Sequence, residues 1–168
     1  MFSSQLSIQG KYAELLKKYS RDKQGEKITF TVTDNGGNKQ DIFLFDNYLQ
    51  GYMVSAMLGI LNNKCIEDDG DRTNEARIFA DILAKRRSEL ETIVQFMILS
   101  NVSDSADKRI REAFTINREN GDYLEKMVTS YARGGLIIID EAFKDCKTFE
   151  DVANKMIIFV NGIRTVNE

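Results

Sequence analysis

The chain has 168 residues, of which 42% are hydrophobic and 29% charged, and its formal net charge is −3. These values are ordinary for one soluble globular domain, and we expect residues 1–168 to form a single domain. The chain has no His, which excludes Ser-His and Cys-His catalytic pairs and histidine metal ligands. No apolar run reaches the length of about 18 residues that a membrane-spanning helix needs, and the N-terminal residues lack a signal-peptide pattern. We therefore expect a cytoplasmic protein with no membrane partner.

The first part of the chain predicts a helix followed by a β-hairpin. Apolar side chains fall at helical spacing through residues 5–20. From about 27 to 45, β-branched and aromatic residues alternate on both sides of Asp34-Asn-Gly-Gly-Asn38, which favours a hairpin. This turn lacks the Gly-Lys-Ser/Thr ending of a phosphate-binding loop.

Residues 46–62 predict a buried helix with Asp46 as its N-cap. The following segment, 62–74, is polar and rich in acidic residues, which is typical of a solvated loop. A calcium loop would need an oxygen ligand where Cys65 stands. With no metal-spaced cysteines either, the sequence indicates neither a metal site nor a cofactor.

Residues 74–101 predict one long helix with apolar side chains at near-heptad spacing. Arg86 falls within that stripe, so we expect it to reach solvent or to pair with a carboxylate, with a contact to a partner or a phosphate as the less favoured alternative. A shorter helix should begin at Ser103 or Asp104 and run to Phe114. Six basic residues of these helices make nucleic-acid binding an alternative function if they converge on one face: Lys85, Arg86, Arg87, Lys108, Arg109 and Arg111.

The C-terminal part predicts a long helix over 122–144 and a last helix that opens at Thr148. Thr148-Phe-Glu-Asp151 resembles a capping box, and Gly162 should end the helix. The expected buried side of this last helix consists of Val152, Met156, Ile157, Phe159 and Val160.

Leu136-Ile-Ile-Ile-Asp-Glu141 matches the strand signature of nucleotide hydrolases, in which the Asp holds magnesium. The signature needs a phosphate loop and alternating strands and helices, and the chain has neither pattern. An enzyme that uses Asp140 and Glu141 is therefore the least favoured alternative, and we expect no catalytic residues. A continuous helical face through 124–142 explains the stretch better.

Gly134 and Gly135 lie in the middle of that helix, where two glycines cost up to about 2 kcal/mol relative to alanine. Such a cost suggests that another backbone packs very close to the face that also carries Tyr131 and Ile138, or that the helix bends there. The neighbour could be the Ala56/Gly59 face of segment 46–62, or another protein chain, including a second copy.

Tyr131-Ala-Arg-Gly-Gly-Leu136 resembles a helix of small helical proteins encoded beside bacterial phage-defence genes, including DNA phosphorothioation systems. The resemblance implies a biological setting and carries over no catalytic residues. The sequence thus predicts a mainly α fold, an irregular bundle of five or six helices with one N-terminal β-hairpin. Its predicted function is that of a non-enzymatic accessory protein. It would recognise a protein partner through the hairpin or the 62–74 loop.

Overall fold

A computed structural model describes residues 2, 4–21, 30–115 and 120–165, and the side chains of the last helix as far as Gly162. Over these residues the fold is mainly α with an N-terminal hairpin, which confirms the predicted fold class. The described helices are α1 (Gly10–Tyr19), α2 (Tyr48–Leu61), α3 (Ala80–Lys85), α4 (Arg87–Leu99), α5 (Ala106–Phe114), α6 (Gly121–Phe143) and α7 (Phe149–Thr165). The strands are β1 (Leu6–Gln9), β2 (Phe30–Thr33), β3 (Lys39–Ile42) and β4 (Glu75–Ile78).

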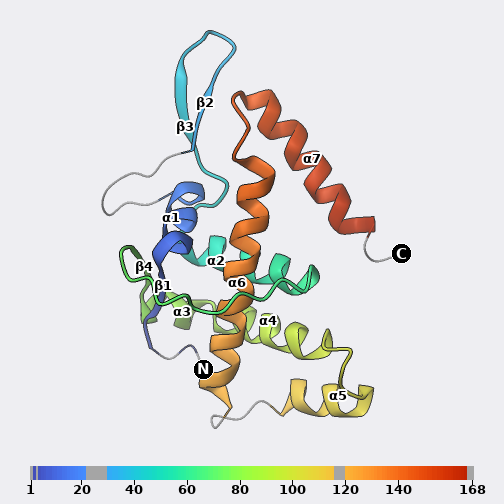
Figure 1. Cartoon of the computed structure of the whole chain (residues 1–168). Helices are drawn as coiled ribbons and strands as arrows, with labels where there is room; N and C mark the ends of the chain where they lie inside the picture. The colour runs from blue at the N-terminus through green and yellow to red at the C-terminus, as the bar shows by residue number, and fades with distance from the viewer. Residues whose placement is uncertain (1, 3, 22–29, 116–119, 166–168) are drawn as a thin grey trace.

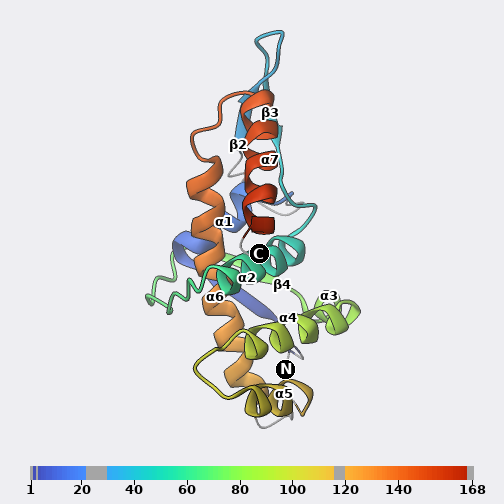
Figure 2. The same ribbon diagram turned by 90° about the vertical axis from the view of Figure 1, so that its right-hand side faces the viewer.

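The centre of the molecule is the crossing of α2 and α6. α6 runs along the length of the molecule, and α2 crosses it in both ribbon views (Figures 1 and 2). The larger apolar core gathers around this crossing, with Tyr52, Ala56, Val128 and Leu136 fully or almost fully buried. A smaller core lies beside it, between the hairpin, the end of α6 and α7. The two helices therefore position the candidate residues that lie on α6.

α2 begins with a side-chain cap. Asn47 accepts a hydrogen bond from the backbone N–H of Gln50 at 2.9 Å, and the Gln50 side chain accepts one from the N–H of Asp46 at 2.8 Å. Asn47 is therefore the N-cap, and the prediction of Asp46 was wrong by one residue. Both residues have the short polar side chain that suits a cap. The hydrogen bond from the Gln50 N–H to the Asn47 side chain identifies Asn47 as the cap.

The hairpin forms where it was predicted, with Phe30 opposite Ile42 and Thr33 opposite Lys39. The Asp34 carboxylate accepts hydrogen bonds from the backbone N–H groups of Asn38 and Gly36, each at 2.9 Å. These bonds lower the pKa of Asp34. Predicted hairpin residues 27–29 lie outside the described residues, and residues 43–45 lie beyond the end of β3.

The hairpin extends away from the α2–α6 crossing (Figure 1). One of its edges is joined to the segment before α7, because the N–H of Thr33 donates to the carbonyl oxygen of Lys147 at 2.8 Å. The hairpin is therefore docked at the same end of the molecule as α7.

The predicted helices over 5–20 and 74–101 were wrong at their N-terminal ends. Residues 6–9 and 75–78 form β1 and β4, an antiparallel pair with Leu6 opposite Ile78. Short runs such as Leu6-Ser-Ile-Gln9 fit both a helical and an alternating pattern, so tertiary pairing decides between them. Gly10, with a φ of +61°, turns the chain from β1 into α1, a conformation that glycine adopts at little cost.

The remainder of the predicted 74–101 helix is divided at Arg86, which ends α3 and caps α4. Arg86 therefore lies at a helix break rather than within a continuous stripe. Its guanidinium donates to Glu89 at 2.9 Å, as the carboxylate interpretation of this arginine predicted. α5 starts later than predicted, with Ser105 as its N-cap.

Candidate functional site

The two mid-helix glycines of α6 lie where other parts of the chain approach closest. A Cβ added to Gly135 would sit 1.8 Å from the carbonyl oxygen of Ser55 on α2, and one added to Gly59 would sit 2.0 Å from that of Tyr131. A Cβ on Gly134 would sit 1.8 Å from the carbonyl oxygen of Lys64. Each of these glycines thus has a backbone carbonyl packed against it from within the same chain.

Tyr131 and Ile138, the other two residues of the predicted close-packing face, are only half-buried. Tyr131 contributes its backbone carbonyl to the crossing, whereas its side chain packs at the edge of the larger core. Leu136 and Ile139, each 1% exposed, supply the deeply buried apolar side chains of this part of α6. The buried face is therefore rotated by about one residue from the predicted one.

Asp140 and Glu141 lie in the last turns of α6, which is helical from Gly121 to Phe143 and contains no strand. Asp140 accepts hydrogen bonds from the Lys18 ammonium and the Tyr19 hydroxyl, both at 2.8 Å. Burial alone would raise the pKa of Asp140, but these two hydrogen bonds outweigh it and lower the pKa. Burial and the bond to Asp140 raise the pKa of Tyr19.

Glu141 has a different neighbour from Asp140. Its side chain is 60% exposed and pairs with Lys64 at 3.3 Å. The two carboxylates therefore serve separate structural contacts. In the described part of the chain, no group of three Asp, Glu, His or Cys residues is placed to hold a metal ion.

The predicted basic patch consists mainly of side chains that have acidic neighbours three or four residues away in the sequence. Lys85 pairs with Asp81, Arg86 with Glu89, Arg87 with Glu91, and Lys108 with Asp104 and Glu112. Arg109 donates to the carbonyl oxygen of Leu99 at 2.6 Å, and Arg111 is exposed. The positive charge of these helices is largely balanced locally, which disfavours phosphate binding.

Arg133 is a buried cation that the sequence analysis did not single out. It is 9% exposed and holds the 62–74 loop against α6 through Asp68 at 3.3 Å and the carbonyl oxygen of Ile66 at 3.4 Å. The backbone N–H of Ile66 donates in turn to the carbonyl oxygen of Ser130 at 3.0 Å. These contacts hold the first part of the loop against α6. In the sequence, the feature that could have indicated Arg133 is its position as a large charged residue between Ala132 and Gly134.

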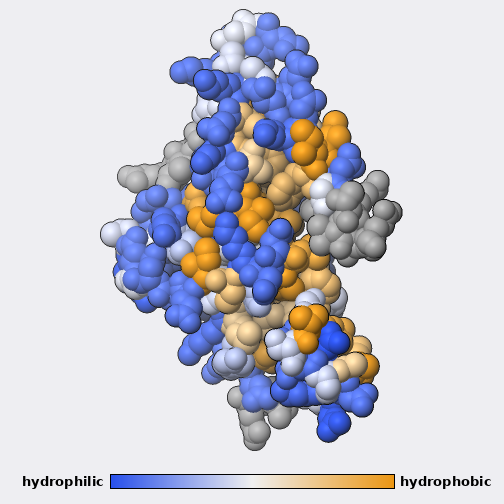
Figure 3. Space-filling model, turned by 45° about the vertical axis from the view of Figure 1, so that its right-hand side comes forward, coloured by the Kyte–Doolittle hydropathy of each residue, from blue (hydrophilic) through white to orange (hydrophobic). Residues whose placement is uncertain are grey.

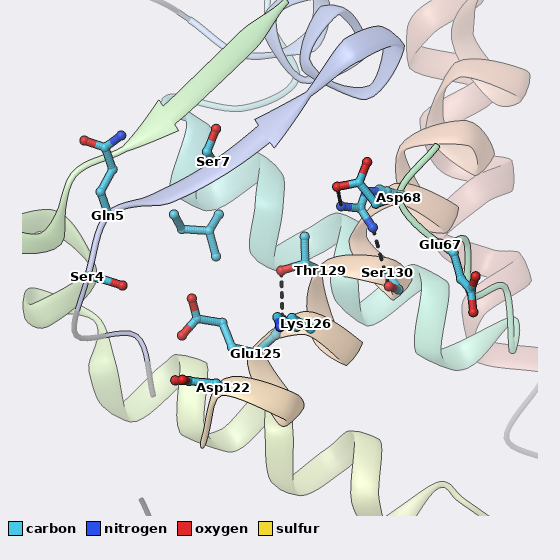
Figure 4. Close-up of a pocket in the computed structure, with 12 residues that line it drawn as sticks. Ser4, Gln5, Ser7, Glu67, Asp68, Asp122, Glu125, Lys126, Thr129 and Ser130 are labelled. Atoms are coloured by element: carbon cyan, nitrogen blue, oxygen red, sulfur yellow. Dashed lines mark hydrogen bonds and ion pairs between the residues drawn. The ribbon is translucent and has the colours of Figure 1, made fainter. Parts of the chain in front are cut away.

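A cavity of about 570 Å³ lies beside Arg133. Figure 4 shows Ser4, Gln5 and Ser7 on one side of it and Asp122 and Glu125 of α6 on another. The volume suits a small ligand.

Several of the cavity's charged groups are already engaged within the chain. Glu125 accepts the backbone N–H of Phe2 at 2.6 Å, and Asp68 pairs with Arg133. Hydrogen bonds from Arg72 and from the Gly70 N–H lower the pKa of Asp68. These internal pairs indicate that the charges of the cavity mainly tie the N-terminal segment and the loop to α6.

α7 begins with the predicted capping box. Thr148 Oγ1 accepts from the N–H of Asp151 at 3.1 Å, and Asp151 accepts from the N–H of Thr148 at 2.9 Å. The helix continues past Gly162 to Thr165, so the predicted end at Gly162 was wrong. Among the described residues, a Cβ added to Gly162 would meet no atom of another segment within 4 Å.

The predicted buried side of α7 was wrong for three of its five residues. Val152 and Phe159 pack against the smaller core, and the Phe159 ring lies 5.9 Å from that of Phe143. Met156, Ile157 and Val160 are instead 37%, 60% and 45% exposed. The error arose because the apolar arc of α7 is wider than its contact with the rest of the chain.

We call the exposed part of this arc the α7 flank, and it consists of Phe149, Ala153, Met156, Ile157 and Val160. α7 stands at the right-hand side of the molecule in Figure 1, next to the upper part of α6, and faces the viewer in Figure 2. Figure 3 shows orange surface beside the grey C-terminal residues, and more orange over α5, where Ile110 and Phe114 are exposed. The fold thus leaves large apolar side chains on two peripheral helices.

Comparison with known proteins gives no family, because no protein-family model, curated protein or solved structure matches the chain. Among the described residues, no helix combines the length and the apolar character needed to cross a membrane.

Proposed function

We propose that this protein is a non-enzymatic accessory protein that acts by protein–protein recognition, with the α7 flank as its main contact surface. The observation that carries the proposal is the exposure of Phe149, Met156, Ile157 and Val160 along one side of α7. A contiguous apolar surface of this kind is typical of interaction sites. The pairing of Asp140 and Glu141 with separate lysines supports recognition rather than catalysis.

The biological setting follows from the Tyr131–Leu136 resemblance. We propose that the protein works in the cytoplasm beside the proteins of a bacterial phage-defence system. The glycines of this stretch contribute to recognition indirectly, because they position α6, against which α7 docks.

The test is quantitative affinity purification of the tagged protein from its native host, comparing wild type with an Ile157→Glu variant. Ile157 is 60% exposed, so the substitution should leave the fold intact while placing a charge on the α7 flank. The matched control is Ile158→Glu, which changes the next residue, 65% exposed. Ile158 lies about 100° further round the helix and on the side opposite Met156 and Val160.

We expect proteins recovered with wild type and with Ile158→Glu to be lost with Ile157→Glu. Equal recovery with all three proteins would reject the α7 flank as the contact surface. Recovery of no protein above a tag-only control, together with a monomeric mass, would reject the recognition function itself.

A further inference from the structure

We propose that the occupant of the α7 flank is the α7 flank of a second copy of this chain, packed in antiparallel orientation. This inference rests on the proposed function, because it assigns a partner to the same surface. It is carried by the spacing of the apolar residues, by the distribution of charge along α7 and by the length of the helix.

The apolar residues of the α7 flank have the spacing of a helix–helix seam. Phe149, Ala153, Met156 and Val160 follow one another at alternating steps of four and three residues, the spacing of a and d positions in a coiled coil. The side that packs on the rest of the chain uses Val152 and Phe159 instead. The seam is therefore a separate stripe, next to the docked side, that the described part of the chain leaves exposed.

The charges of α7 are arranged for self-pairing. Its acidic residues, Glu150 and Asp151, are both in the first turn. The basic residues follow, with Lys155 in the middle and Arg164 near the end of the sequence of α7. A parallel second copy would place the two first turns, with Glu150 and Asp151, side by side, whereas an antiparallel copy places each first turn beside the helical position that Arg164 occupies in the sequence. Antiparallel packing also sets opposite ends of the two helix dipoles side by side.

A single register satisfies the seam and the charges together. When residue 157 lies on the two-fold axis, position 150 of one helix falls opposite position 164 of the other, and Met156 lies close to Val160 of the second copy. Such an interface is isologous, as expected for a symmetric dimer. Ile157, which is 60% exposed in the single chain, then lies beside Ile157 of the second copy.

The size of α7 indicates a reversible dimer. Its 17 residues span about 25 Å at roughly 1.5 Å per residue. A helix pair of this length buries less than the roughly 800 Å² per partner of a standard stable interface. The dimer should therefore dissociate on dilution.

The test is sedimentation equilibrium of the purified full chain over a range of concentrations. Wild type should move from 19.2 kDa towards twice that mass as concentration rises. Val160→Glu, which buries a charge in the seam, should raise the dissociation constant by at least about tenfold. Ile158→Glu is the control on the opposite side of α7 and should dimerise like wild type.

Charge reversal tests the orientation without touching the apolar seam. Glu150→Arg should weaken the dimer, and adding Arg164→Glu should restore it. If the double variant dimerises no more tightly than Glu150→Arg alone, the antiparallel register is contradicted.

Two outcomes separate this inference from the proposed function. In the first outcome, wild type stays at 19.2 kDa at every concentration, while other proteins are recovered with wild type and lost with Ile157→Glu. This outcome rejects the second copy as the partner and supports the recognition function. A dimer that is unaffected by Val160→Glu rejects the α7 flank as its interface.

Discussion

Gly135 and Ser55 touch backbone to backbone, because a Cβ added to Gly135 would sit 1.8 Å from the carbonyl oxygen of Ser55. The same crossing brings Gly59 of α2 against the carbonyl of Tyr131, so each helix presents a glycine to the other. A reciprocal contact of this kind leaves no space for a side chain at either position. The helix crossing therefore depends on glycine at both sites.

Gly135→Ala should destabilise the protein although alanine is the better helix former by up to about 1 kcal/mol. The added methyl group must push α6 away from α2, and overpacking of this kind costs about 1–3 kcal/mol. We expect the free energy of unfolding, measured by chemical denaturation, to decrease by an amount within that range. Gly162→Ala is the control, because its Cβ meets nothing within 4 Å, and it should be neutral or slightly stabilising. Equal stabilities for both variants would contradict the packing account.

Arg133→Met should loosen the 62–74 loop more than Arg72→Met does. Both arginines pair with Asp68, but the Arg133 side chain is 10% exposed and that of Arg72 is 54% exposed. Exposed pairs contribute little, about 0–1 kcal/mol, whereas Arg133 also donates to the Ile66 carbonyl. Limited proteolysis of the loop measures the difference. Identical cleavage rates in the two variants would show that Arg133 does not tether the loop.

Asp140 should contribute a pH-dependent part of the stability. Its folded-state pKa lies below the unfolded value of about 3.9 because Lys18 and Tyr19 donate hydrogen bonds that outweigh burial. The ionised carboxylate therefore stabilises the fold above about pH 4, and this contribution is lost as the pH falls through the folded-state pKa. The stability difference between wild type and Asp140→Asn should be constant above pH 5 and shrink below about pH 4.

Glu141→Gln is the control for that measurement, because Glu141 is 60% exposed. Its difference from wild type should be small throughout the same pH series. A difference for Asp140→Asn that does not change with pH would show that the carboxylate charge is not what Lys18 and Tyr19 stabilise.

We expect no sequence-independent DNA binding by the basic residues of α3, α4 and α5. Four of the six pair with acidic side chains in the structure, so few are available to replace phosphate counterions. Fluorescence anisotropy with duplex DNA at low salt tests this expectation. Binding that falls steeply with salt, and that weakens on Arg111→Ala substitution, would instead support the nucleic-acid alternative.

The sequence predicted best where one local signal was sufficient. The hairpin followed from Asn35-Gly36 between alternating residues. Of the two neighbours proposed for the glycine face, segment 46–62 is the one that packs against Gly135, whereas Gly134 meets Lys64 of the 62–74 loop. The β1–β4 pair could not be found this way, because each strand has four residues and pairs with a segment far along the chain. Its periodicity is too short to distinguish from a helix.

The α7 flank could not be predicted because the spacing of apolar residues indicates a hydrophobic helix face but does not show which other segment or chain packs against it. Met156, Ile157 and Val160 have the pattern of a buried helix face, yet the described residues of the single chain leave them exposed. Arg133 was missed for a related reason, since its partners Asp68 and Ile66 belong to a loop that looked solvated.

The most direct test of the account is hydrogen–deuterium exchange of the α7 amides at low and high protein concentration. α7 docks through only part of its apolar arc, so its amides should exchange much faster than those of α6 in dilute protein and in Val160→Glu. In concentrated wild-type protein, exchange in α7 should slow while exchange in α6 stays unchanged. If α7 exchanges as slowly as α6 in the Val160→Glu variant, the claim that α7 is stabilised by packing against a second copy is contradicted.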